Sequence, residues 1–217
     1  MKTLLLILLQ CYTALFPKET QEAVDFFTQH SQEIGTHLKR LDKETRKIAI
    51  AIVAPEVSQY STVMDFFELR TLFISYRNFG RGDFSVGYFQ MKPSFIEGLE
   101  SEIAKSSALT KKYSSYLPRG TDKEKRETRL KRLRTLEWQL KYLEVFIDVA
   151  KQKTKGIKFP DNESKLRYWA TLYNSGFSLS KERVKHYQNK KLFPRSSRSF
   201  NYSDVAVEFY KLLGGST

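Results

Sequence analysis

Residues 47–56 read Lys-Ile-Ala-Ile-Ala-Ile-Val-Ala-Pro-Glu, and this short stretch decides the fold. No polar side chain interrupts the apolar run between Lys47 and Glu56. A helix without a polar face has to be buried on all sides, so the run predicts a helix at the centre of the molecule. We expect this helix to extend from Asp42 towards Glu56, with Pro55 disturbing its last turn. The acidic side chain of Glu56 therefore comes directly after a helical segment that excludes water.

On both sides of this run, apolar residues recur at the three- and four-residue steps of amphipathic helices. Glycines interrupt the pattern at positions 80 and 82, and residues 81–91 are typical of irregular chain or a short strand pair. The other helices are expected over residues 19–34, 64–79, 123–151 and 202–213, with one more beginning at Pro93 and another running from about Pro160 to Gly176. The sequence therefore predicts a single, mainly α domain over residues 17–217, with at most a small β element near residues 80–91.

Length and charge narrow the class of protein. The chain has 217 residues, of which 41% are hydrophobic, and its formal net charge is +13. This length suits one domain, and the apolar content is enough for a core. So basic a chain favours polyanionic partners, which are nucleic acid, an anionic membrane surface or an acidic wall polymer. Charge alone does not choose among them.

The N-terminus favours export. A positive start is followed by an apolar run from Leu4 to Leu9 and by the small residue Ala14. The run is far shorter than the about 20 residues that cross a bilayer, so residues 1–16 predict a secretory signal peptide. The alternative is an ordinary buried helix. Cys11 is the only cysteine and weakly matches a lipoprotein box, which would make it a lipidated first residue; in either case the mature chain has no internal disulfide.

Two further patches follow Glu56 in an informative order. Residues 87–94 read Gly-Tyr-Phe-Gln-Met-Lys-Pro-Ser, and residues 170–176 read Ala-Thr-Leu-Tyr-Asn-Ser-Gly. Together the three patches resemble the lytic transglycosylase and goose-type lysozyme superfamily. The pattern of that family is a catalytic Glu at the end of a buried helix, a Gly-Leu-Met-Gln-x-x-Pro-Ser/Thr stretch and a later Ala-x-Tyr-Asn-x-Gly helix end. The similarity covers about residues 47–176, although Ala and Tyr are one residue further apart here.

The resemblance implies a lysozyme-like fold with a groove in which peptidoglycan glycan strands are cleaved between N-acetylmuramic acid and N-acetylglucosamine. Glu56 would be the catalytic acid, Tyr173 would hold the acid or the sugar, and Asn174 would anchor the helix end. Tyr88 and Phe89 replace the family's Leu and Met, which would make the groove floor more aromatic. The residues expected to bind the glycan are Ser85, Gly87, Phe89, Gln90, Met91, Tyr173 and Asn174.

Elementary chemistry supports the role of Glu56 independently. Loss of solvation at the end of a dry helix raises the pKa of a carboxyl group, and a carboxyl that is still protonated near neutral pH can act as a general acid. Glycoside cleavage requires such a proton donor, because an unprotonated alkoxide is a poor leaving group. Three plainer interpretations stay open: a solvent-exposed Glu56, an ordinary core tyrosine at Tyr173, and a Gln90 that only fixes a loop.

The sequence leaves the number of catalytic carboxylates open. A hydrolytic muramidase needs a second carboxylate near the acid. By the resemblance, a lytic transglycosylase needs only one, with help from the substrate's N-acetyl group. Asp65, Glu68 and Asp83 are the candidates for a second carboxylate, and Asp83 lies closest in sequence to the Gly-Tyr-Phe-Gln stretch. Asp83 equally suits a residue that fixes a glycine-rich turn. We therefore favour the mechanism with one carboxylate.

Rival functions depend on the basic segment 123–134, which holds seven bases and two acids. It predicts attachment to the wall, to an anionic envelope surface or to nucleic acid, or else merely a solvated face with ion pairs. The expected export signal and the lack of a nucleic-acid module argue against nucleic acid. A non-catalytic peptidoglycan-binding module is the other rival. We expect a monomer in the periplasm or cell envelope, without a cofactor, and the three histidines do not predict a metal site.

Overall fold

The structure is a computed structural model that describes residues 18–60, 66–191, 193–195 and 198–214. It is mainly helical, as predicted. The expected signal peptide over residues 1–16, with Cys11, lies outside the described residues. The helices are α2 (Lys18–Gln29), α3 (Ser31–His37), α4 (Lys43–Gln59), α5 (Phe66–Phe79), α6 (Pro93–Lys105), α7 (Ser107–Tyr113), the 3₁₀ turn η2 (Ser114–Tyr116), α8 (Asp122–Leu133), α9 (Leu136–Lys153), α10 (Asn162–Ser175), α11 (Lys181–Gln188) and α12 (Tyr202–Leu212).

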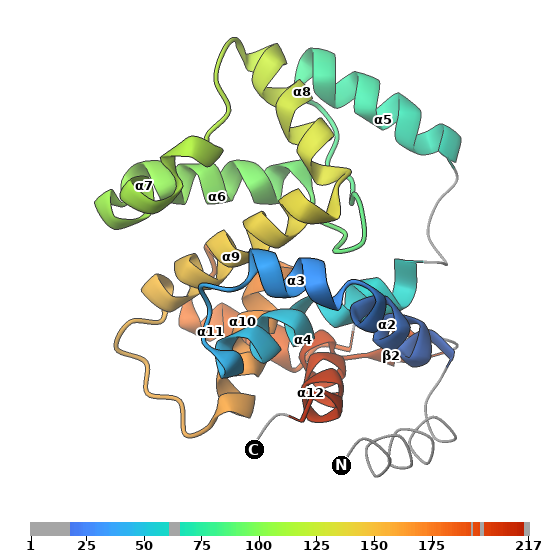
Figure 1. The fold of residues 1–217 in the computed structure, drawn as a ribbon, viewed down its shortest axis with the longest axis vertical. Coiled ribbons are helices and arrows are strands. Elements are labelled where there is room, and N and C mark those ends of the chain that lie inside the picture. Colours follow the sequence, from blue (N-terminus) through green and yellow to red (C-terminus); the bar gives the residue numbers. More distant parts are fainter. Residues whose placement is uncertain (1–17, 61–65, 192, 196–197, 215–217) are drawn as a thin grey trace.

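Helix α4 is the central helix that its sequence predicts. Asp42 caps it by accepting a hydrogen bond from the Thr45 backbone at 2.8 Å. The residues of its apolar run from Ile48 to Ala54 are fully buried except Ile50. Helices α2, α9, α10 and α12 pack around it (Figure 1). The helix continues past Pro55 to Gln59, so Glu56 lies in its last turn and not beyond its end.

The long helix predicted over residues 123–151 is two helices, α8 and α9. Helix α8 ends at its C-cap residue Arg134. Thr135 then caps the start of α9 by accepting a hydrogen bond from the Trp138 backbone. The apolar stripe passes through the break without a change of spacing, and its residues Leu130, Leu133, Leu136, Leu140, Leu143 and Ile147 are all buried. The regular apolar spacing therefore gave no sign of the boundary between α8 and α9, which the capping residue Thr135 determines.

Two other predictions need correction. The single helix expected over residues 19–34 is divided at His30 into α2 and α3. The sheet does not lie only near residues 80–91, where the structure has one isolated bridge between Val86 and Met91. A hairpin pairs β1 (Phe193–Arg195) with β2 (Arg198–Phe200). Strands of three residues are too short to give an alternating pattern, so the sequence does not reveal them.

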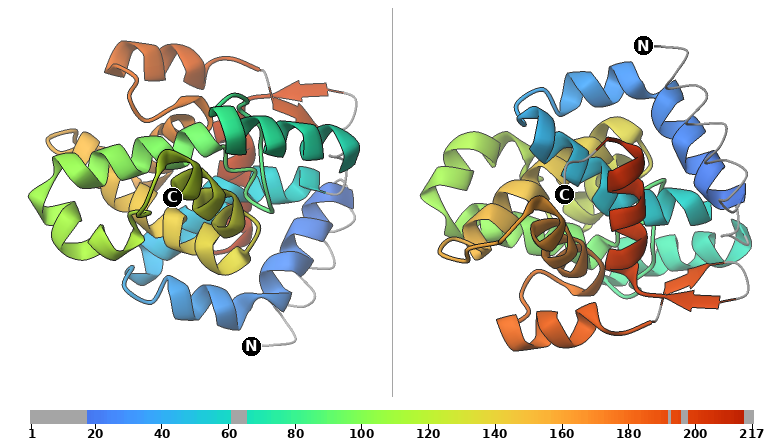
Figure 2. Two further views of the ribbon diagram at one scale, coloured as in Figure 1. Left: turned by 90° about the horizontal axis from the view of Figure 1, so that it is seen from above. Right: turned by 90° about the horizontal axis from the view of Figure 1, so that it is seen from below.

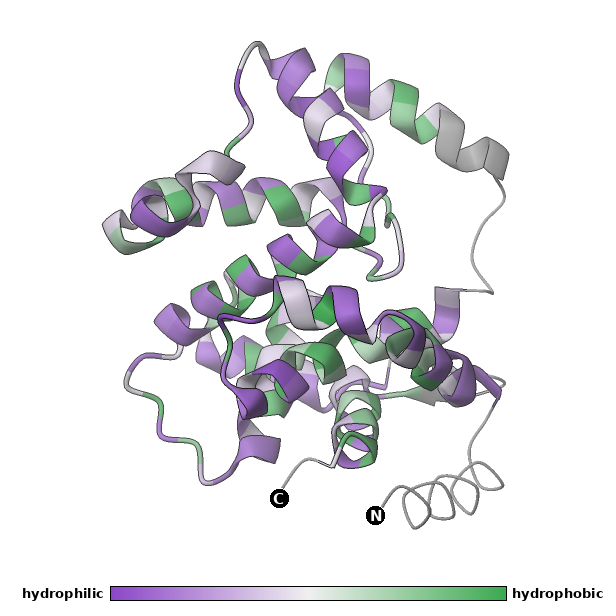
Figure 3. Cartoon of the chain, in the orientation of Figure 1, coloured by the Kyte–Doolittle hydropathy of each residue, from purple (hydrophilic) through white to green (hydrophobic). Residues whose placement is uncertain are grey.

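Helices α5, α6, α7 and α8 form the upper part of the molecule in Figure 1, and the helices packed on α4 form the lower part. Helices α5 and α8 lie side by side at one end of the molecule, and Figure 3 shows α8 as mostly hydrophilic. Seen from above and from below, α11 and the hairpin follow one edge while α2 and α3 follow the opposite edge (Figure 2). In the described ranges, no helix has both the length and the apolar composition needed to cross a bilayer.

Candidate active site

A cavity of about 540 Å³ opens beside the last turn of α4. Its walls come from three separate parts of the chain, which are α4, the segment from residue 85 through α6, and the end of α10 with the loop after it. Six of the residues predicted for the site line this cavity together: Glu56, Ser85, Gln90, Met91, Tyr173 and Asn174. The three sequence patches are thus brought together around one concave surface, as a binding site requires.

Glu56 carries one of two carboxyl groups in the described part of the cavity lining, and the other belongs to Glu102. Burial raises the pKa of the Glu56 carboxyl group to about 7, because the charged form has lost much of its hydration. A hydrogen bond with Tyr202 and the positive charge of Lys92 oppose this rise by favouring the ionised form. Glu56 can therefore hold a proton near neutral pH and can also release it. This is the behaviour required of a group that first acts as an acid and then as a base.

Tyr202, at the start of α12, is a site residue that the sequence did not reveal. Its hydroxyl donates to the backbone carbonyl of Ile52 at 2.8 Å and also contacts the Glu56 carboxyl group. A tyrosine hydroxyl has one proton. That proton can serve the Ile52 carbonyl while Glu56 is neutral and turn to the carboxylate when Glu56 ionises. The only signal was an aromatic residue at a helix start, which does not indicate a partner so distant in sequence.

Tyr173 ties the end of α10 to the predicted loop. Its hydroxyl donates to the backbone carbonyl of Phe89 at 2.6 Å. Burial raises the pKa of the Tyr173 hydroxyl well above its usual value, and the nearby charge of Glu56 adds to the rise. The Tyr173 hydroxyl therefore donates its proton to the Phe89 carbonyl of the loop and not to the Glu56 carboxyl group. The tyrosine is both a core residue and part of the cavity wall.

The loop itself is held by Gln139 of α9. The Gln139 side chain accepts a hydrogen bond from the Phe89 backbone at 2.8 Å and donates to the Leu133 carbonyl at 2.6 Å. Gly87 passes directly over this amide with a φ of 73°. A Cβ atom on Gly87 would lie 1.5 Å from Nε2 of Gln139 and 2.7 Å from the Leu133 carbonyl oxygen. Only glycine fits, because both the space and the backbone conformation exclude a side chain.

Gln90 has a left-handed backbone conformation, with a φ of 46°, which is uncommon for a residue other than glycine. Its side-chain amide donates to the Gly87 carbonyl at 2.7 Å, and its backbone N–H donates to the same oxygen at 3.0 Å. Gln90 therefore does fix the loop, as one interpretation of the sequence held. It also lines the cavity, so both interpretations apply.

Two predicted contacts with the substrate need correction, because the cavity lining does not include Gly87 or Phe89. The Phe89 side chain is fully buried in the core, and the residue contributes its backbone groups to the loop. Tyr88 stacks outside the lining, with ring centroids 4.7 Å from both Phe26 and Tyr60. The predicted aromatic groove floor is therefore not formed by these two residues, since their side chains lie on other sides of the loop.

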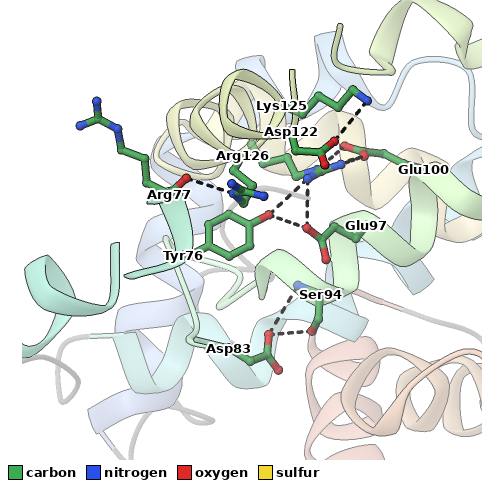
Figure 4. Close-up of polar contacts among 10 residues, drawn as sticks. Tyr76, Arg77, Asp83, Ser94, Glu97, Glu100, Asp122, Lys125 and Arg126 are labelled. Carbon is green, nitrogen blue, oxygen red and sulfur yellow. Dashed lines mark hydrogen bonds and ion pairs between the residues drawn. The ribbon is translucent and has the colours of Figure 1, made fainter. Parts of the chain in front are cut away.

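Asp83 fixes the start of α6. One carboxylate oxygen accepts hydrogen bonds from the Ser94 hydroxyl at 2.6 Å and from the Ser94 backbone at 3.4 Å (Figure 4). The other oxygen lies 3.6 Å from the Lys92 ammonium group. Asp83 is not in the cavity lining. Of the other candidate second carboxylates, Asp65 and the side chain of Glu68 lie outside the described residues.

The arginines of the basic helix α8 are half-buried and bind neighbouring parts of the molecule. The Arg129 guanidinium group pairs with Glu100 at 2.6 Å and with Glu97 at 3.0 Å. Arg126 donates to backbone carbonyls at the end of α5, which lack helical partners. Arg132 stacks on the Trp138 ring. These contacts favour the structural interpretation of the basic segment over attachment to a polyanion.

Comparisons of the chain with protein-family models, with curated proteins and with solved structures found no match. Among the described residues, His, Cys, Asp and Glu side chains do not gather in groups of three that could hold a metal ion. What the site can do follows from its own chemistry. It offers one carboxyl group of raised pKa, with an ammonium group and a phenol beside it, in a cavity open to a large ligand.

Proposed function

We propose that the protein cleaves peptidoglycan glycan strands between N-acetylmuramic acid and N-acetylglucosamine, with Glu56 as the catalytic acid. The observation that carries this proposal is the carboxyl group of Glu56, whose pKa burial raises to about 7 at the wall of an open cavity. The ordered resemblance to lytic transglycosylases and goose-type lysozymes supports the same substrate. We propose, together with this function, the lysozyme-like fold that the resemblance implies.

The chemistry uses one carboxyl group twice. Glu56 gives its proton to the glycosidic oxygen as that bond breaks, while the N-acetyl oxygen of the muramic acid bonds to the anomeric carbon. The Glu56 carboxylate then takes the proton of the C6 hydroxyl of the same sugar, whose oxygen attacks the anomeric carbon and displaces the N-acetyl oxygen. The products are a new chain end and a 1,6-anhydro end, and Glu56 regains its proton. Lys92 and Tyr202 stabilise the carboxylate between the two steps.

The surroundings of Asp83 favour this mechanism over hydrolysis. Both of its oxygens are engaged by Ser94 and Lys92, and the residue lies outside the cavity lining. In the described part of the lining, the second carboxyl group belongs to Glu102, which is paired with Lys153 at 3.0 Å. A water-activating carboxylate has to lie beside the sugar opposite the acid, and Asp83 is not in the cavity lining. One-carboxylate cleavage is therefore the mechanism that we propose.

The location of the protein is part of the same proposal. A signal peptide over residues 1–16 would carry the chain to the periplasm or cell envelope, where peptidoglycan lies, with or without a lipid anchor at Cys11. There the protein would act as a monomer and without a cofactor. Separation of a culture into periplasmic, membrane and cytoplasmic fractions tests this location.

Incubation of the purified protein with sacculi, followed by mass analysis of the released fragments, tests the proposed function. We expect 1,6-anhydromuramic ends from the wild type, no products from Glu56→Gln, and unchanged products from Asp83→Asn. Reducing ends that disappear in Asp83→Asn would establish hydrolysis instead. Binding to sacculi without any cleavage by the wild type would identify a non-catalytic module and contradict the proposal.

A further inference from the structure

The cavity extends from Glu56 along one face of α6. The α6 residues that line it are Ser94, Phe95, Gly98, Ser101, Glu102 and Lys105, which recur at helical three- and four-residue steps. With a rise of about 1.5 Å per residue, this face is roughly 16 Å long. Residues 173–178 also line the cavity, and Tyr173 and Phe177 contact Phe95 of α6. We call this part of the cavity the α6 groove; Glu56 lies near one end and Lys105 at the other.

The far end of the α6 groove carries a surplus of positive charge. Glu102 lies between two ammonium groups, that of Lys153 at 3.0 Å and that of Lys105 at 3.8 Å. One carboxylate neutralises only one of these two cations. Lys153 makes the closer pair, and the Lys105 side chain is 69% exposed. The last turn of α9 holds this arrangement against α6, because the Gln152 amide donates to Ser106 at 3.1 Å. Lys105 therefore remains available to a ligand.

A neutral sugar chain offers such a cation only hydroxyl and amide oxygens, whereas a carboxylate adds the opposite charge and a stronger hydrogen bond. Peptidoglycan differs from a neutral amino-sugar polymer in this respect, since its muramic residues carry lactyl groups and its peptide stems carry free carboxylates. We propose that Lys105, at the far end of the α6 groove, binds a carboxylate of the substrate and so favours acidic glycan over neutral glycan. This inference rests on the proposed function and specifies the substrate that the same site selects.

The test is a set of binding titrations with Glu56→Gln protein, which does not consume the ligand. The ligands are neutral chitohexaose, a peptidoglycan hexasaccharide with its peptide stems, and the same hexasaccharide after an amidase has removed the stems and left the lactyl carboxylates. Lys105→Gln is compared with Lys111→Gln, an exposed lysine of α7 outside the cavity lining. We expect Lys105→Gln alone to reduce the preference for acidic glycan over chitohexaose by about two- to five-fold, as for an exposed ion pair.

The pattern of losses identifies the carboxylate. Weaker binding of only the stem-bearing ligand indicates a peptide carboxylate. Weaker binding of only the stem-free ligand indicates the lactyl carboxylate, which is held in an amide bond until the amidase removes the stem. Weaker binding of both acidic ligands indicates that Lys105 binds either carboxylate. High salt should reduce the preference of the parent protein in the same direction. An equal loss for chitohexaose, or no change with any ligand, would overturn the inference. If the wild type also cleaves sacculi, that result leaves the proposed function intact; a wild type without cleavage would overturn the function whatever Lys105 does.

Discussion

The position of Glu56 shows how one residue obtains its chemistry from its neighbours. The apolar side chains of α4 remove water from the end of the helix, which raises the pKa of the carboxyl group. Tyr202 and Lys92 limit the rise, so the pKa stays at about 7. A stronger rise would prevent release of the proton, and a weaker one would leave no proton to donate.

Replacement of Tyr202 by Phe tests this balance. The variant lacks a hydrogen bond that favours the ionised form of Glu56, so we expect the pKa of Glu56 to rise. The alkaline limb of the pH profile of cleavage should move upward by about half to one pH unit. Tyr210→Phe is the matched control, because Tyr210 lies on the same helix and its hydroxyl bonds to Glu44. A downward shift, or an equal shift in the control, would contradict the assigned role.

Gly87 tests the fit of the loop on Gln139. Gly87→Ala should destabilise the protein by about 1–3 kcal/mol, because the new Cβ atom meets Gln139 and the φ is positive. It should also lower cleavage, since the same loop positions Gln90 and Met91. Gly35→Ala in α3 is the control; no atom lies within 4 Å of its Cβ, and we expect a small gain in stability. Chemical denaturation measures both effects, and similar values for the two variants would contradict this account.

At the scale of elements, α8 shows that basic residues can join one helix to its neighbours. Arg126 binds the last carbonyls of α5, and Arg129 joins α8 to α6 through Glu100. These contacts hold α5 and α6 in place, and α6 is a wall of the cavity. The charge pattern alone could not reveal this use, because the acidic partners lie in other helices.

Replacement of Arg129 by Ala separates the structural interpretation from polyanion binding. Glu100 is 8% exposed and would lose its partner, so the free energy of unfolding should fall by about 3–5 kcal/mol. Lys123→Gln on the exposed face of α8 should change stability by less than about 0.5 kcal/mol. Urea denaturation of both variants checks this. A stable Arg129→Ala protein that binds sacculi poorly would favour the attachment role instead.

The elements also show what the sequence could predict. The unbroken apolar run located α4, and the helices predicted over residues 160–176 and 202–213 correspond to α10 and α12. Boundaries failed where the pattern continued through a cap, as at Thr135, and the hairpin of residues 193–200 was missed because its strands are short. Both features depend on local hydrogen bonds, and the spacing of hydrophobic residues does not indicate where such bonds form.

At the scale of the whole molecule, the cavity combines segments that are far apart in the chain. Of the residues that motif order grouped, six line the same cavity: Glu56, Ser85, Gln90, Met91, Tyr173 and Asn174. Motif order could not reveal Tyr202 and Lys105, because their roles depend on how α12 and α6 pack around the cavity. Nor could it show that Phe89 faces the core. The resemblance indicated which chain segments surround the cavity, and the packing determines which of their side chains line it.

The burial of Glu56 also affects the stability of the whole fold. Its pKa is about 7 in the folded state and about 4.5 in the unfolded chain, so the folded protein holds the proton more tightly. Below pH 4.5 the group is neutral in both states and costs nothing. As the pH rises from about 4.5 to 7, ionisation in the unfolded chain increasingly favours unfolding, and above pH 7 the difference is constant because the group is ionised in both states. Glu56→Gln should therefore be more stable than the wild type by about 1–3 kcal/mol at pH 8 and nearly equal to it at pH 4.

The most direct test of the central claim is a titration of the Glu56 carboxyl group itself. Carbon NMR of protein labelled at the glutamate carboxyl carbon follows each side chain, and Glu56→Gln assigns the resonance. The account predicts a midpoint near pH 7 for Glu56. A midpoint near 4.5, the ordinary value for a solvated glutamate, would contradict the claim that burial at the end of α4 prepares this residue to donate a proton.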